Sequence, residues 1–290
     1  MYNNANELKL LCKQQNKPIS QIAIETEAIL SNCSIEDVSE KLKNSIKIMK
    51  NACSKTLKKE IPSISGLTSG DAKRLFTYAE NCNTIFSKDI LKGVAYALSC
   101  FEVNTSMGKI VASPTAGSCG ILPASLFVVA KQINASETLL INAFATAAAV
   151  GSVIEKNATL SGAEGGCQAE CGSAAAMAAA AIVEMKGGNA EQSFNAAAIA
   201  LKNVMGLVCD PIAGLVEIPC AKRNAIGVVN ALLCADMALA GIKSFVPFDE
   251  VVSAMYAVGK SIPCELRETG IGGLAGTPTG IQVRKKIFEQ

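Results

Sequence analysis

The sequence predicts a mainly α-helical protein, with Ala-rich helices joined by Gly-rich loops. Half of the 290 residues are apolar and Ala is abundant, so there is ample material for a large core of closely packed helices. Apolar residues recur at three- and four-residue spacing, which is the helical period. No strong alternation of apolar and polar residues is present, and the β-branched runs are short, so strands are not expected.

Residues 1 to about 60 predict a polar helical region. Ser34 and Asp37 form a capping-box signal for a helix start. One apolar stripe then follows at helical spacing: Ile35, Val38, Leu42, Ile46, Met49, Cys53 and Leu57. The lysines between these positions predict a solvated face. A Pro- and Gly-bearing break follows, so we divide the chain into a helical N-terminal region, 1–62, and one continuous all-α domain, 63–290.

Eight helices are predicted after this break. Their ranges are 71–82, 88–103, 121–132, 137–155, 172–186, 190–206, 223–241 and 248–259. The 190–206 helix should end at Gly206. The apolar runs 139–154 and 173–185 are short for a membrane span, and the run 225–242 contains Asn230 and Asp236. Their Ala and Gly content favours buried helices, so no membrane contact is expected.

The composition excludes several classes of function. A net charge of only +2 gives no electrostatic case for nucleic acid. Histidine is absent, which excludes Ser-His and Cys-His nucleophiles and His-containing zinc sites within this chain. The 12 cysteines are too few for a disulfide scaffold, and no signal peptide opens the chain. We therefore expect a cytoplasmic protein whose cysteines are thiols or metal ligands.

Two loops carry chemical signals. The loop Ser113–Gly120 precedes an apolar helix, where glycines allow a close backbone approach and helix amides favour an anion. Hydroxyls of Ser113, Thr115 and Ser118 add donors, although an ordinary helix entry explains the loop equally well. The glycine-rich loop 268–280 implies disorder or close packing, and its Leu and Ile favour packing. A dinucleotide-binding function for it is weakly indicated, because no strand precedes it and no helix is expected to follow.

Cys167, Cys209 and Cys220 each fall where a helix should meet a Gly- or Pro-bearing loop. A helix N-terminus lowers a thiol pKa, and three soft ligands in such positions suit iron–sulfur chemistry. Only 16 charged residues lie in 110–245, and six of them are within three residues of one of these cysteines: Glu164, Glu170, Asp210, Glu217, Lys222 and Arg223. Charges in an apolar segment are costly unless paired or used. Salt bridges at helix ends are the alternative explanation.

Four segments resemble the iron–sulfur-dependent L-serine dehydratases, and specifically the catalytic α chain of the two-chain type. They are 104–124 (NTSMGKIVASPTAGSCGILPA), 164–181 (EGGCQAECGSAAAMAAAA), 207–227 (LVCDPIAGLVEIPCAKRNAIG) and 266–280 (LRETGIGGLAGTPTG). The resemblance covers nearly the whole sequence. The cysteine spacing, 42 residues and then 11, is the spacing with which that family holds a [4Fe–4S] cluster.

The resemblance implies β-elimination of water from L-serine, giving pyruvate and ammonia without pyridoxal phosphate. Cys167, Cys209 and Cys220 would hold three irons, and the fourth iron would act as a Lewis acid. The family also implies a separate β chain that packs on this one, forming a hetero-oligomer. The proton acceptor is left open among four residues or a group of the partner chain; the four are Lys222, Glu164, Glu170 and Lys109.

The substrate carboxylate is assigned to the first loop, through Ser113, Thr115, Gly117 and Ser118, with Arg223 as a supporting charge. Alternatively, the loop and Arg223 surround the cluster without touching substrate. No cysteine follows Cys264, so no C-terminal thiol covers the open iron, and we expect an oxygen-sensitive cluster. Three other functions stay open: an iron–sulfur L-cysteine desulfidase, an electron carrier, and a structural zinc protein that uses Cys171 as a fourth ligand.

Overall fold

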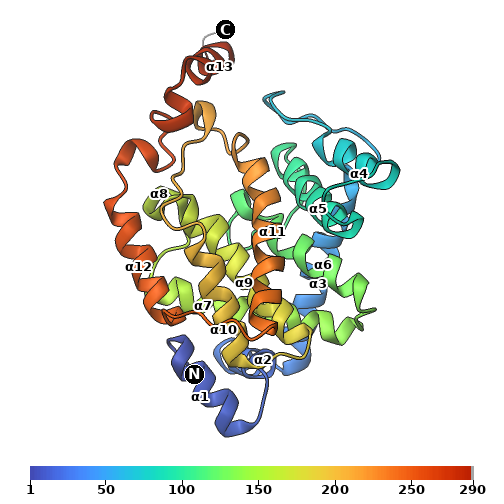
Figure 1. Cartoon of the computed structure of the whole chain (residues 1–290), viewed down its shortest axis with the longest axis vertical. Helices are drawn as coiled ribbons and strands as arrows, with labels where there is room; N and C mark the ends of the chain where they lie inside the picture. Colours follow the sequence, from blue (N-terminus) through green and yellow to red (C-terminus); the bar gives the residue numbers. More distant parts are fainter. Residues whose placement is uncertain (289–290) are drawn as a thin grey trace.

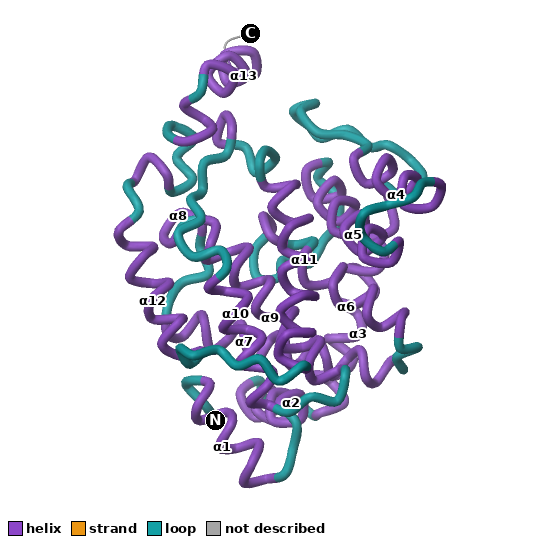
Figure 2. Tube along the Cα trace, viewed as in Figure 1, coloured by secondary structure: helices purple, strands orange, loops and turns teal. Residues whose placement is uncertain are grey.

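The computed structural model describes residues 1–288 and confirms a mainly α-helical protein (Figures 1 and 2). The helices are α1 (Ala5–Gln15), α2 (Ile19–Leu30), α3 (Ile35–Lys55), α4 (Asp71–Asn81), α5 (Lys88–Thr105), α6 (Ile121–Gln132), α7 (Glu137–Asn157), α8 (Gly162–Gly165), α9 (Ser173–Met185), α10 (Ala190–Lys202), α11 (Cys220–Leu239), α12 (Phe248–Ser261) and α13 (Pro278–Phe288). Strands are absent from this described range, where one isolated parallel bridge pairs Cys209 with Arg267.

Helix α9 forms the centre of the core. Every residue from Ser173 to Val183 is buried, and most of them are alanines. Short side chains let neighbouring helices approach closely at the density of a protein interior. The helix accordingly packs against α6, α7, α10 and α11, which surround it in Figure 1. This confirms that the Ala-rich segment is a buried helix.

Helix α7 is long and apolar enough to cross a membrane by length and composition, and it is the one helix of residues 1–288 that passes this test. It begins at Glu137, as predicted, and ends at Asn157, two residues beyond the predicted end. Of its most apolar stretch, 56% is buried inside the protein. It packs against α2 and α9, as a core helix does.

The N-terminal helices follow the sequence pattern. Ser34 Oγ accepts the Asp37 N–H at 3.0 Å, and the Ser34 N–H donates to Asp37 Oδ2 at 3.0 Å, so the predicted capping box is confirmed. Leu8 and Ile19 are fully buried and join the same apolar core as α7 and α9. The division of the chain at residue 62 remains a prediction.

The structure corrects two helix boundaries and adds one helix that the sequence did not predict. Helix α10 ends at Lys202, and turns fill the interval to Gly206, whose φ of +86° only glycine adopts readily. Helix α11 begins at Cys220, three residues before its predicted start. The expectation that no helix follows the second glycine-rich loop is wrong, because α13 begins there. Thr277 Oγ1 accepts the Gly280 N–H at 3.1 Å, and Pro278 fits the first helical position.

Candidate active site

Cys167 begins the helical segment that becomes α9. A five-residue π-turn, Gln168–Gly172, separates it from that helix, and such turns are frequent at functional sites. The buried Gln168 side chain fixes this turn. Its amide donates to Gly165 O at 2.9 Å and to Met255 O at 3.0 Å, and its oxygen accepts the Gly206 N–H at 2.9 Å. Gln168 therefore ties the Cys167 segment to α12 and to the turn that leads to Cys209.

Cys209 lies in the loop after α10, as predicted, and the second glycine-rich loop holds it. The Cys209 N–H donates to Leu266 O at 2.8 Å, and Cys209 O accepts the Glu268 N–H at 2.7 Å. Beside it, Asp210 Oδ2 accepts the Leu274 N–H at 2.8 Å. A Cβ atom at Gly273 would collide with the Asp210 side chain, so glycine is required for this approach. The loop 268–280 is thus packed against the Cys209 segment, as its apolar residues predicted.

Cys220 opens α11, and Asn224 lies one turn later. Asn224 is fully buried. Its amide donates to Gly117 O at 2.7 Å and to Cys220 O at 3.0 Å, and its oxygen accepts the Gly120 N–H at 3.0 Å. One side chain thereby fixes the first loop, Ser113–Gly120, against the third cysteine.

The four cysteines of these segments, Cys167, Cys171, Cys209 and Cys220, form what we call the cysteine centre. All four are buried. Hydrogen bonds from Cys171 and Cys209, with the charge of Arg223, hold the pKa of Cys167 well below its usual value. The pKa of Cys209 is raised by its hydrogen bond to Cys167, and that of Cys220 by burial and then by the Cys167 charge. Thiols from three distant parts of the chain therefore interact directly or through charge.

Arg223 supplies the positive charge of the centre. Its guanidinium donates to Val208 O at 2.9 Å and to Asp210 Oδ1 at 2.8 Å, which are the neighbours of Cys209. Its side chain is largely buried and lies close enough to Cys167 for the two charges to act on each other. The predicted helix-end salt bridge is therefore present, and the same guanidinium faces the thiols. A salt bridge at a helix end and a charge placed beside the thiols are therefore compatible explanations of the clustered charges.

Glu170 lies where the first loop meets the cysteines. Its Oε1 accepts the Thr115 hydroxyl at 2.7 Å, and its Oε2 is 4.0 Å from Cys209 Sγ. Glycines at 117 and 162 leave room for this carboxylate, since a Cβ at Gly117 would lie 3.2 Å from Oε1. Burial, followed by the charge of Cys167, raises the pKa of Glu170 to about 7. This carboxyl group is suited to exchanging a proton near neutral pH.

The other three candidates for proton transfer lie elsewhere. Lys222 is exposed and forms an ion pair with Asp71. Glu164 is also exposed, and its Oε2 accepts the Thr159 hydroxyl at 2.7 Å. Lys109 is exposed after α5. Of the four, Glu170 is the one that contacts a thiol of the cysteine centre within residues 1–288.

The hydroxyls of the first loop are partly engaged within it. Ser113 Oγ donates to Cys119 O at 3.5 Å, and Ser118 Oγ accepts the Thr115 N–H at 3.4 Å. Gly117 and Ser118 are buried in a short 3₁₀ turn. Through Thr115 and Asn224 the loop contacts both Glu170 and the start of α11. The structure therefore brings the predicted substrate loop to the cysteine centre.

Sequence reasoning gave no role to two acidic residues of the site: Glu217, named only among the clustered charges, and Glu268, which was not singled out. Glu217 is buried and accepts the hydroxyls of Ser65 at 2.7 Å and Thr68 at 3.0 Å. It thus brings the stretch 63–68, interpreted only as a break, to the Cys220 segment. Glu268 adopts a φ of +65°, and burial followed by the Cys167 charge raises its pKa. Polar residues inside otherwise apolar or glycine-rich segments were the available signal.

Within residues 1–288, no group of three or more His, Cys, Asp or Glu side chains has the geometry of a site for one metal ion. A structural zinc site, which needs four ligands around one ion, therefore gains no support. The thiolates of an iron–sulfur cluster bind different irons, so they need not converge on one point.

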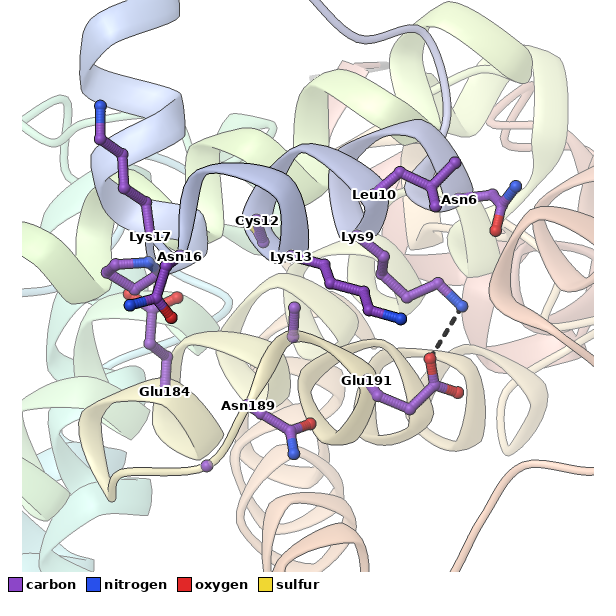
Figure 3. A pocket seen from close by; sticks show the side chains of 13 residues that line it. Asn6, Lys9, Leu10, Cys12, Lys13, Asn16, Lys17, Glu184, Asn189 and Glu191 are labelled. Atoms are coloured by element: carbon purple, nitrogen blue, oxygen red, sulfur yellow. Dashed lines mark hydrogen bonds and ion pairs between the residues drawn. The ribbon is translucent and has the colours of Figure 1, made fainter.

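Of two cavities in the structure, one reaches the cysteine centre and the other does not. A groove of about 550 Å³ reaches the cysteine centre and is lined by Cys171, Leu207, Pro219 and Arg223 among others. A second cavity, of about 640 Å³, lies between α1 and the start of α10 (Figure 3). There Lys9 pairs with Glu191 at 2.9 Å, and Cys12 is the single lining cysteine. The two cavities share no lining residue.

Comparison with known proteins gives consistent similarities. The family model described as serine dehydratase alpha chain matches residues 14–275. The chain is 49% identical to the probable L-serine dehydratase alpha chain of Bacillus subtilis, over 99% of this chain and 96% of that one. It is 49% identical to the L-serine dehydratase alpha chain of Peptoniphilus asaccharolyticus, over 100% and 99% of the two chains. It is 44% identical to the L-serine dehydratase TdcG of Escherichia coli, over 62% of this chain and 40% of that one.

Proposed function

The chain belongs to the serine dehydratase alpha chain family, and we propose that it performs its reaction with a [4Fe–4S] cluster held by Cys167, Cys209 and Cys220. It is an L-serine dehydratase, a lyase that eliminates water from L-serine. The aminoacrylate formed by this elimination tautomerises to an imine. Water hydrolyses this imine to pyruvate and ammonia, so the water lost in the first step is taken up in the last.

The observation that carries the proposal is the meeting of three buried thiols from distant segments around the largely buried Arg223. Soft thiolate donors select iron–sulfur clusters or zinc among metal centres, and a negative cluster is stabilised by the Arg223 charge and by a helix start at Cys220. Arg267, whose backbone pairs with Cys209, has a buried Nε without a protein partner in the described residues. The donor set and its surroundings therefore fit the cluster.

An iron of the bound cluster that carries no protein thiolate supplies a Lewis acid for the substrate carboxylate and hydroxyl. The chain supplies the remaining parts. We assign substrate orientation to the first loop, where Gly117 and Ser118 form a buried turn beside Glu170 and Ser113 is buried in the same loop. Thr115 donates to Glu170, so it orients that carboxylate.

We assign removal of the Cα proton to Glu170. It is the candidate that contacts both the first loop and Cys209, whereas Lys222 is held in an ion pair at the surface. With Glu170 as acceptor, the proton moves from Cα to the carboxylate and is then donated to the departing hydroxyl, which leaves as water. With Glu170 as the base, the reaction does not require a histidine, which the chain lacks.

The relatives that match along their full length are named alpha chains, which implies a separate beta chain as partner. The chain covers only 40% of the Escherichia coli relative, which carries further sequence in the same polypeptide. We propose that the beta chain forms a hetero-oligomer with this chain and completes the site. Full turnover by the cluster-loaded alpha chain alone would contradict that role.

The test is anaerobic purification, analysis of iron and sulfide per chain, and assay of pyruvate from L-serine and L-cysteine. We expect about four irons and four sulfides for one [4Fe–4S] cluster, with turnover of L-serine. A colourless zinc protein would refute the cluster, and preference for L-cysteine would indicate a desulfidase. The names of the relatives give no support to the desulfidase.

A further inference from the structure

Cys171 lies in the cysteine centre, and the proposed reaction gives it no task. Its Sγ is 3.5 Å from the Sγ of Cys167, and both residues are buried. The two are four residues apart in one helical segment, across the π-turn Gln168–Gly172. Four residues of helix rise about 6 Å, which lies within the Cα separation of about 4.4–6.8 Å found in disulfides. A bond between these thiols needs little movement of the backbone.

The surface groove gives a small oxidant a route to this pair. Cys171 lines the groove of about 550 Å³ that runs between the turn at Met205–Leu207 and the start of α11. A second close pair, Cys100 and Cys119, has its Sγ atoms 3.9 Å apart, but both residues are fully buried. The chain thus contains one close thiol pair with a member, Cys171, that lines the groove, and a second close pair that does not line it.

We propose that Cys167 and Cys171 form a reversible disulfide in protein that has lost its cluster, and that this bond blocks cluster reassembly until a thiol reductant opens it. The inference rests on the proposed function, because it takes Cys167 as a cluster ligand. Hydrogen peroxide oxidises one thiol to a sulfenic acid and releases water. The other thiol attacks that sulfur, the S–S bond forms, and a second water leaves. Two thiols and one peroxide give one disulfide and two waters.

The disulfide blocks cluster reassembly because a cysteine must be a free thiolate to bind a metal. A disulfide removes Cys167 from the set of three ligands, while Cys209 and Cys220 remain on their own segments. A bound cluster would prevent this oxidation, because the Cys167 sulfur would then be a ligand of iron. A dithiol reductant reverses it by exchange, which returns both thiols and oxidises the reductant.

The experiment starts from anaerobically purified holoprotein. Its iron is removed with a chelator, the protein is treated with hydrogen peroxide, and free thiols are blocked before peptide mass spectrometry. We expect the peptide that contains Cys167 and Cys171 to have lost two hydrogens and to carry no blocking group. Iron and sulfide uptake without reductant should be lost in the wild type, restored by dithiothreitol, and retained in Cys171→Ala and Cys171→Ser. Cys100→Ala should behave as the wild type.

A disulfide from Cys167 to Cys209, or free thiols at both positions after peroxide, would overturn the inference. So would a Cys171 variant that still needs reductant for reassembly. The peptide map is made on the wild-type chain, so it stands even where a variant folds poorly. Iron analysis of the untreated holoprotein separates the two proposals: absent iron refutes the cluster, whereas iron with unlinked thiols after peroxide refutes only the disulfide.

Discussion

The protein buries two groups of cysteines, and their surroundings differ. The cysteine centre lies at junctions of loops and helices, with Arg223 and Glu170 beside its thiols. The second group, which we call the core trio, consists of Cys53, Cys100 and Cys119, packed with Ala52 and Val103 in a small apolar cluster. Burial alone brings thiols together, because free cysteine behaves as a small apolar residue. Charges and fixed polar loops are what distinguish a chemical site.

The two groups also differ in the charge beside their thiols. In the cysteine centre, hydrogen bonds from Cys171 and Cys209, together with the Arg223 charge, lower the pKa of Cys167. In the core trio, hydrogen bonds from Cys119 and Cys53 lower the pKa of Cys100, while burial raises the pKa of Cys53. Each group therefore has one thiol of lowered pKa, and the cysteine centre differs in placing a positive charge beside it. Four comparisons test this contrast.

Replacement of a ligand should have the largest effect. Cys209→Ala removes one of three cluster ligands, so we expect loss of iron and more than about a 100-fold loss of pyruvate formation. Loss of a residue that only hydrogen-bonds to a metal ligand already costs about 10–100-fold in metal affinity or activity, and loss of a ligand should cost more. Cys100→Ala is the matched control, since it removes an equally buried thiol of the core trio. It should retain full iron content. Equal iron loss in both variants would abolish the distinction between the groups.

The second comparison is between two carboxylates, Glu170 beside the cysteine centre and Glu102 near the core trio. Glu170→Gln should lower kcat by about 10²–10⁴-fold, the usual contribution of a general base, without loss of iron. Glu102, near Cys100 on α5, is also buried, and its Oε1 accepts the Ala72 N–H at 3.1 Å. Glu102→Gln should change stability and leave kcat unaltered. A wild-type kcat in Glu170→Gln would transfer the role of base to Glu268 or to the partner chain.

Asn224 tests whether loop fixation belongs to the cysteine centre. Asn224→Ala leaves the buried Gly117 O and Gly120 N–H without this partner, which should cost about 1–3 kcal/mol in the free energy of unfolding. Activity should fall further than stability requires, because the first loop loses its tie to Cys220. On the same helix, Asn230→Ala removes a bond to Ala200 O at 2.8 Å and should leave activity unchanged. Urea unfolding and pyruvate assays at matched iron content separate the two effects.

Much of this contrast was accessible from the sequence. Helical periodicity predicted the main helices, and the resemblance to the serine dehydratases, which includes the long spacing of Cys167, Cys209 and Cys220, identified three thiols of the cysteine centre. The core trio was not distinguished, because Cys53 fits an ordinary apolar stripe and Cys100 lies within a helix. The roles of Asn224, Glu217 and Gln168 depend on contacts between residues 38 to 152 positions apart. Such contacts follow from tertiary packing, which local patterns do not encode.

The smallest effect should come from Cys53, through the pH dependence of stability. At pH 7, Cys53→Ala loses a buried sulfur comparable to a methylene group, which costs about 1 kcal/mol. The raised pKa of Cys53 means that the folded state binds this proton more tightly than the unfolded state does. Its stabilisation is complete below the unfolded pKa of about 8.5 and is lost as the pH rises toward the folded pKa. Urea midpoints measured from pH 7 to 10 should therefore converge for wild type and variant. Parallel curves would mean that burial does not keep the Cys53 thiol protonated in the folded protein.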